Sequence, residues 1–106
     1  MSQMVLAYTD EPDALMEAIR NKMPALKTWV LDDSGDLIHA TAQYEEVGYF
    51  TVDTEEDHVV FSHAFFSDAG VARHEKPAKS AQMQGHLVSM LLTHFYDLIS
   101  SVEATR

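Results

Sequence analysis

The feature that most constrains the fold of this chain is a regular alternation of short β-type runs with acidic turns. Residues 32–36 and 53–57 are the clearest of these turns. Aspartate side chains can bond the backbone of a turn, and Gly35 can adopt a positive φ angle, so the chain is expected to reverse there. One helical pattern precedes the alternation and another follows it. This order predicts a two-layer α+β fold with an N-terminal helix, a four-stranded antiparallel meander and a long C-terminal helix.

The four strands of the meander are expected at residues 26–31, 37–43, 47–52 and 58–66. The first holds Trp29 and the β-branched Thr28 and Val30, which favour strands. Residues 67–79 follow the last strand and are interpreted as a loop, because they contain glycine and proline.

The first helix is expected to begin near Asp10 and Pro12, since aspartate can cap a helix and proline is tolerated in the first turn. It should end before Pro24, because a residue that precedes proline avoids helical backbone angles. Apolar residues recur at every fourth position between these limits: Leu15, Ile19 and Met23. The run 4–8 is interpreted as a frayed tail rather than an edge strand.

The C-terminal helix is expected at residues 80–101 and is unusually apolar. At about 100° per residue, its apolar side chains cover an arc of roughly 200°, about twice what contact with one sheet requires. The arc is formed by Met83, Leu87, Val88, Met90, Leu91, Leu92, Phe95, Leu98 and Ile99, and His94 falls inside it. A helix of this kind is expected to contact a second surface as well as the sheet.

The strand at 58–66 leads to the same expectation, because both of its faces carry apolar side chains. A half-exposed antiparallel strand normally alternates apolar with polar residues. We therefore predict a homodimer and name Phe66, Leu92 and Phe95 as candidate interface residues. The chain is expected to form one domain, residues 1–106, with an ordered core at about 10–102.

The formal charge is −10, from 17 acidic and 7 basic residues. Direct binding to nucleic acid is disfavoured, because it needs clustered lysine and arginine; a basic protein partner would suit the charge better. The absence of cysteine excludes disulfides and thiolate chemistry. No run approaches the roughly 20 apolar residues of a membrane span, so a cytoplasmic protein without membrane contact is expected.

Six histidines are the main candidates for catalytic or metal chemistry, at positions 39, 58, 63, 74, 86 and 94. None has the spacing of a known motif. His86 and His94 lie eight residues apart, about 12 Å along a helix, which is too far for both to bind one ion. His63 and His94 fall among apolar residues and are interpreted as hydrogen-bonded core residues, with a buried functional pair as the alternative. No catalytic, metal-binding or cofactor-binding residues are assigned.

These patterns favour a small, acidic, non-enzymatic binding or regulatory module that acts as a homodimer through an apolar helix or sheet surface. An acidic inhibitor that imitates nucleic acid at a basic target site is the first alternative. Acidic residues concentrated on one surface, in rows spaced like phosphates, would favour it, and scatter over all the turns would exclude it. A small enzyme that uses His63 or His94 is the second alternative, and it would need a water-accessible cleft that contains a histidine and a carboxylate.

Overall fold

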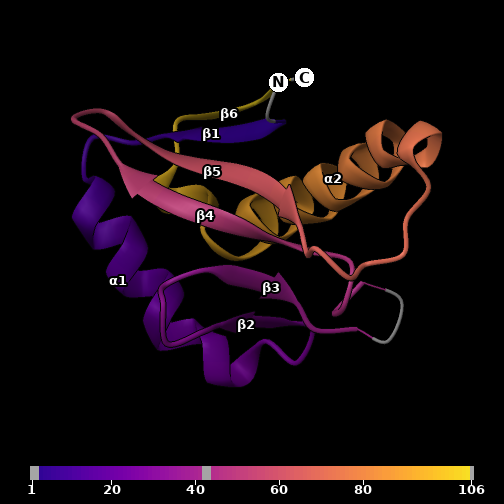
Figure 1. Cartoon of the computed structure of the whole chain (residues 1–106). Coiled ribbons are helices and arrows are strands. Elements are labelled where there is room, and N and C mark those ends of the chain that lie inside the picture. The colour runs from indigo at the N-terminus through magenta and orange to yellow at the C-terminus, as the bar shows by residue number, and fades with distance from the viewer. Residues whose placement is uncertain (1–2, 42–43, 106) are drawn as a thin grey trace.

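The computed structural model describes residues 3–41 and 44–105 and shows one antiparallel sheet with two helices on one of its faces (Figure 1). The sheet has six strands in the order β2-β3-β4-β5-β1-β6. The helices are α1 (Pro12–Lys22) and α2 (Lys76–His94). The strands are β1 (Met4–Tyr8), β2 (Trp29–Leu31), β3 (Leu37–His39), β4 (Gly48–Thr54), β5 (His58–Phe65) and β6 (Ser101–Thr105). Short 3-10 turns are η1 (Met23–Ala25), η2 (Arg73–Glu75) and η3 (Tyr96–Leu98).

The α+β class and the antiparallel sheet confirm the sequence prediction, and β2, β3, β4 and β5 are the four expected strands, paired in sequence order. The interpretation of residues 4–8 as a tail was wrong. This segment is β1, which lies between β5 and β6 and pairs along its whole length with both. Its alternate residues Val5 and Ala7 are fully buried, so burial of these side chains holds the strand in the sheet.

The prediction for the C-terminal helix was wrong at both ends. α2 begins at Lys76 because Pro77 occupies its first turn, where the missing N–H costs nothing. The helix ends at His94, and the chain then makes the η3 turn and returns to the sheet as β6. Residues 76–79, which were expected in a loop, therefore belong to α2, and residues 102–105, which were expected beyond the helix, belong to β6.

The first helix matches its expected position, but its start differs in detail. Pro12 occupies the first turn, as expected. Asp10 does not cap the helix; the Thr9 hydroxyl instead accepts a hydrogen bond of 3.1 Å from the Glu11 backbone N–H. The helix leads into the η1 turn, which contains Pro24.

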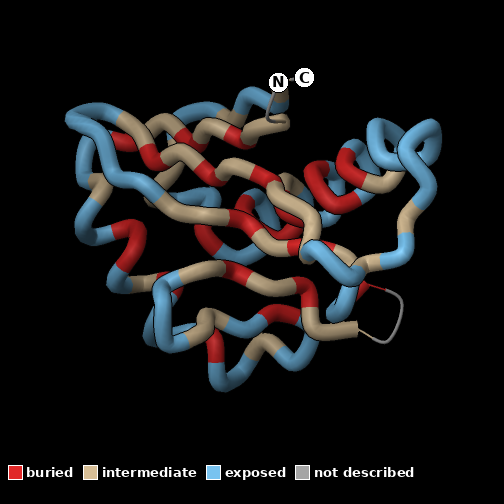
Figure 2. The backbone as a smooth tube through the Cα atoms, viewed as in Figure 1, coloured by how far each residue is buried: buried red, intermediate tan, exposed pale blue. Residues whose placement is uncertain are grey.

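The core lies between the helices and the inner face of the sheet, where buried and half-buried residues alternate along the strands (Figure 2). Its largest fully buried side chains come from both layers: Val5, Leu15, Ile19, Leu37, Phe50, Val59, Phe61, Met83, Leu87 and Leu91. Apolar burial of this kind is the main stabilising contribution in a domain of this size.

Gly48 stands where the sheet leaves no room for a side chain. A Cβ atom at this position would lie 2.5 Å from the Ala64 carbonyl oxygen and 2.7 Å from His63 Nε2. At the first acidic turn, Gly35 has a φ angle of +87°, which confirms the positive φ predicted for it.

Candidate functional site

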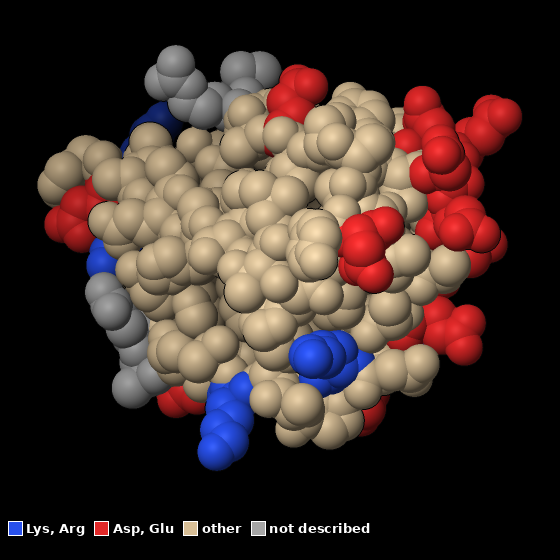
Figure 3. Space-filling view, turned by 180° about the vertical axis from the view of Figure 1, so that it is seen from behind, with Lys and Arg blue, Asp and Glu red and all other residues tan. Residues whose placement is uncertain are grey.

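The outer face of α2 is the most unusual surface of the molecule because it carries no charge. The sequence from Ser80 to Tyr96 contains no Asp, Glu, Lys or Arg, although the chain as a whole has 24 such residues. The exposed side chains of this face are Ala81, Gln82, Gly85, Ser89, Leu92 and Thr93, and together with Tyr96 of the adjoining η3 turn they define what we call the α2 outer face. Seen from behind, the centre of the molecule is a broad uncharged surface (Figure 3).

Two of the three large apolar side chains that are exposed in the described chain lie on the α2 outer face. Leu92 is 46% exposed and Tyr96 is 70% exposed; the third, Val30, lies on β2 and is 44% exposed. Gly85 has open space around it, since a Cβ atom there would meet nothing within 4 Å. The surface thus has projecting apolar side chains next to a residue that has no side chain.

The sheet face opposite the helices is less uniform. Leu6 and Val60 oppose each other at its centre, but Glu103 pairs with Leu6 and Asp53 pairs with Val60. The apolar side chains here are half-buried and are interrupted by exposed carboxylates. Phe66 lies at the end of β5, where its ring packs 5.0 Å from that of Tyr49. The even-numbered side chains of β5 therefore do not form a continuous apolar surface.

The acidic residues gather at one end of the sheet. Ten of the 17 lie in residues 9–13, 32–36 and 53–57, and none of the seven lysines and arginines does. Strand pairing brings these three connections together at the same end, and the acidic side chains visible from behind lie mostly along one edge (Figure 3). Burial raises the pKa of Asp36, and the charge of Asp32 adds to the effect. We call this region the acidic end.

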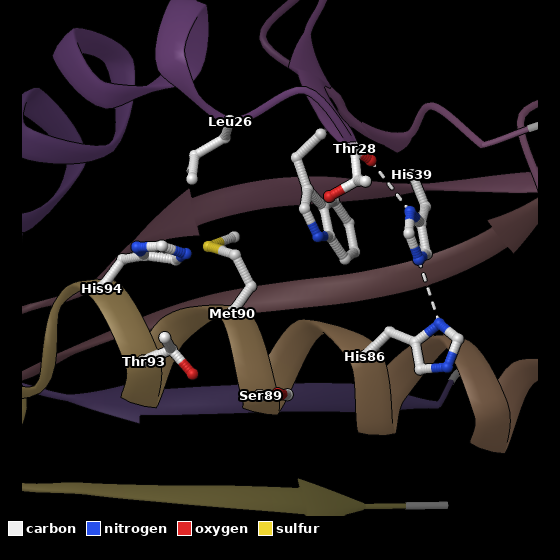
Figure 4. A pocket seen from close by; sticks show the side chains of 9 residues that line it. Leu26, Thr28, His39, His86, Ser89, Met90, Thr93 and His94 are labelled. Carbon is white, nitrogen blue, oxygen red and sulfur yellow. Dashed lines mark hydrogen bonds between the residues drawn. The ribbon is translucent and has the colours of Figure 1, made fainter.

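A second candidate site is a cavity of about 340 Å³ between α2, β3 and the chain that leads into β2 (Figure 4). Its lining is uncharged apart from three histidines: Leu26, Thr28, Trp29, His39, His86, Ser89, Met90, Thr93 and His94. His39 and His86 lie at one end of this cavity and His94 lies at the other.

His39 is held rigidly at the inner face of β3. Its ring stacks on Trp29 at 4.4 Å and on Tyr44 at 5.2 Å, and the side chain is only 6% exposed. Nδ1 lies 2.9 Å from the Thr28 carbonyl oxygen, which can only accept, so Nδ1 carries the proton. Burial lowers the pKa of His39, and the hydrogen bond to Thr28 partly opposes this.

The tautomer of His39 fixes that of its neighbour. His39 Nε2 lies 3.0 Å from His86 Nδ1. In a neutral His39 ring protonated on Nδ1, Nε2 can only accept, so His86 donates through Nδ1–H. The free lone pair of His86 is then on Nε2, on an exposed side chain. The two imidazoles and the Thr28 carbonyl thus form one directed hydrogen-bond chain.

The candidate interface residues do not lie on one surface. Leu92 is on the α2 outer face and Phe66 is on the opposite side of the sheet. Phe95 is 4% exposed and belongs to the core, because it is the residue at which α2 ends and turns toward the sheet. It therefore supplies no accessible contact surface.

His63 and His94, the two histidines that the sequence analysis named, have different surroundings. His63 is buried, as expected: Nδ1 lies 2.8 Å from the Ser80 hydroxyl and Nε2 lies 3.1 Å from the Met83 sulfur. Burial lowers the pKa of His63 to about 4. The interpretation of His94 as a core residue was wrong. It is the last residue of α2 and is exposed, with a cavity on either side of it.

The sequence patterns did not single out the pair formed by His39 and His86. These residues are 47 positions apart and lie on a strand and a helix, so no local spacing joins them. Two features of the sequence placed these residues on faces of their elements. His39 is two positions from Leu37 and so lies on the same face of the strand, and His86 falls in the polar sector of α2. Neither pattern shows that the two faces meet.

No protein-family model matches this chain, and comparisons with curated proteins and with solved structures found no match. None of the helices in residues 3–41 and 44–105 is long and apolar enough to cross a membrane. In the same ranges, no group of three or more histidine or acidic side chains is placed to hold a metal ion.

Proposed function

We propose that this protein is a small, acidic, non-enzymatic binding module that acts as a homodimer through the α2 outer face. The observation that carries the proposal is the absence of charge along an exposed helix in a chain of net charge −10. Exposed helix faces of globular proteins are normally rich in charged residues, and exposed apolar patches commonly mark contact sites.

A second copy is the occupant that this surface suits best. Two chains that each carry −10 repel each other, so a stable contact between them needs a region without carboxylates. The α2 outer face provides one, whereas the opposite sheet face would bring Asp53 and Glu103 into the contact. A two-fold contact uses the same patch on each copy, so the patch must complement itself.

An antiparallel pairing of two α2 helices gives this complementarity. If the two-fold axis passes between residues 88 and 89, Leu92 of one copy faces Gly85 of the other. The large side chain then meets a residue with open space around it, as ridge-into-groove packing requires. Because this pairing is reciprocal, it forms two Leu92–Gly85 contacts.

The proposal is tested with two lysine substitutions at matched exposure. Leu92 and Val30 are 46% and 44% exposed, but only Leu92 lies on the α2 outer face. Leu92→Lys should give a monomer at concentrations where Val30→Lys remains a dimer, because an unpaired buried charge opposes association. Circular dichroism checks that both variants remain folded.

The register of the pairing has its own test. In the double variant Leu92→Lys with Gly85→Glu, the two new charges face each other across the axis, so the dimer should reappear. A monomeric double variant would contradict the register. Dissociation by Val30→Lys and not by Leu92→Lys would move the contact to the sheet and overturn the proposal.

The acidic end favours a second candidate function, the binding of a basic protein surface. Its three connections hold ten acidic residues and no lysine or arginine. An acidic inhibitor that imitates nucleic acid would use such a surface, with an affinity that falls steeply as salt screens the charges. Titration with a lysine- and arginine-rich peptide tests this function. Weakened binding on neutralisation of 53–57, with the dimer unchanged, would support it.

A further inference from the structure

The histidine pair at the end of the cavity can bind a ligand in place of the hydrogen bond that joins its two rings. His39 Nε2 and His86 Nδ1 lie 3.0 Å apart, and His39 comes from β3 whereas His86 comes from α2 (Figure 4). Imidazole nitrogens are common ligands of transition-metal ions, which bind the neutral ring. An ion that replaced this hydrogen bond, with the exposed His86 ring swinging outward to admit it, would have an imidazole nitrogen from each element as a ligand.

His39 is oriented as metal-ligating histidines are. The nitrogen opposite to the proposed ligand atom donates to the Thr28 carbonyl at 2.9 Å, and rings of Trp29 and Tyr44 hold the imidazole plane from both sides. In metal sites, a hydrogen bond of this kind fixes the tautomer and raises the basicity of the ligating nitrogen. Nε2 is thereby held with its lone pair toward His86.

We propose that His39 Nε2 and His86 Nδ1 form a two-histidine site for a divalent transition-metal ion, with the remaining positions of the ion open to water in the adjoining cavity. His86 stays neutral on binding, because the proton on its Nδ1 moves to Nε2 as Nδ1 becomes the ligand.

The charge of the protein favours a cation over an anion here. The cavity lining contains no lysine or arginine that could neutralise an anionic ligand. The net charge of −10 raises the local concentration of cations around the molecule and lowers that of anions.

Copper is the transition-metal ion that this pair of ligands favours. Imidazole nitrogens bind Cu²⁺, Ni²⁺ and Zn²⁺. Among these ions, Cu²⁺ binds a given set of nitrogen ligands most tightly.

The test is titration of the whole chain with Cu²⁺ in a non-chelating buffer, followed by calorimetry and electron paramagnetic resonance. We expect one high-affinity equivalent and a hyperfine pattern from two nitrogens. His86→Gln should weaken this binding at least about tenfold and reduce the pattern to one nitrogen. His86 is exposed, so this variant should fold normally. His39→Gln should weaken binding similarly, with circular dichroism used to confirm its fold.

His94→Gln is the matched control, because His94 lines the same cavity at its far end and is also exposed. It should leave both the affinity and the two-nitrogen pattern unchanged. Retention of the pattern in His86→Gln would overturn the proposal, as would binding only at many weak sites. Neither result depends on whether the chain dimerises, so failure here is distinct from failure of the proposed function.

Discussion

Acid should destabilise this protein through His63. The folded chain holds this side chain in the core, where burial lowers its pKa to about 4, whereas the unfolded chain takes up the proton near pH 6.5. Between these values the unfolded state binds more protons, so the free energy of unfolding falls as the pH falls. The stability that depends on neutral His63 is thus present above pH 6.5 and lost as the pH drops toward 4.

The size of the effect follows from the two pKa values. One proton linked to unfolding changes the free energy by about 1.4 kcal/mol per pH unit, which gives about 3 kcal/mol between pH 6.5 and 4. His63→Gln cannot take up this proton, although it keeps a polar group near Ser80 and Met83. The variant should be less stable than the natural chain at pH 7.5 and should lose less stability on acidification.

The assay is urea unfolding of both chains at several pH values from 7.5 to 4.5, followed by Trp29 fluorescence. Since the carboxylates are common to both chains, the difference between the two pH profiles isolates His63. His74→Gln is the control, because the His74 side chain is 84% exposed; its profile should follow that of the natural chain. Parallel profiles for the natural chain and His63→Gln would refute the reasoning.

Two glycine positions give further predictions. Gly48→Ala should lower the free energy of unfolding by roughly 1–3 kcal/mol, because its Cβ would overlap the Ala64 carbonyl oxygen; Gly85→Ala, measured in dilute protein, is the control and should stabilise α2 by up to about 1 kcal/mol. Equal stability of the two variants in urea unfolding would contradict this account. Gly35→Val should destabilise the first hairpin by about 1 kcal/mol or more, since φ is +87°; an unchanged melting temperature would show that the turn relaxes at little cost.

The sequence identified the elements whose signals are local. The strands from β2 to β5 are rich in β-branched and aromatic residues and are separated by turn residues, so their order and pairing could be predicted. β1 was missed because five residues near the end of a chain carry little periodicity. Its partners in β5 lie 50 to 58 positions away, and pairing over such a separation has no local sequence signal.

The end of α2 shows a second limit of prediction from the sequence. Leu98 and Ile99 continue the apolar spacing of the helix, and no glycine or proline marks its end at His94. Tertiary packing ends the helix there, because Phe95 enters the core and the chain turns back to the sheet. The exposure of His94 follows from this ending and could not be read from periodicity. The meeting of His39 with His86 likewise depends on how α2 crosses the sheet.

The central claim is that two copies associate through the uncharged α2 outer face, and sedimentation equilibrium of the natural chain tests it most directly. Masses measured from micromolar to millimolar concentrations should rise from one chain to two and stop there, because a two-fold contact is closed. The dimer should strengthen from low to physiological salt, since salt screens the repulsion between chains of net charge −10. A mass of one chain over the whole range at physiological salt would contradict the account.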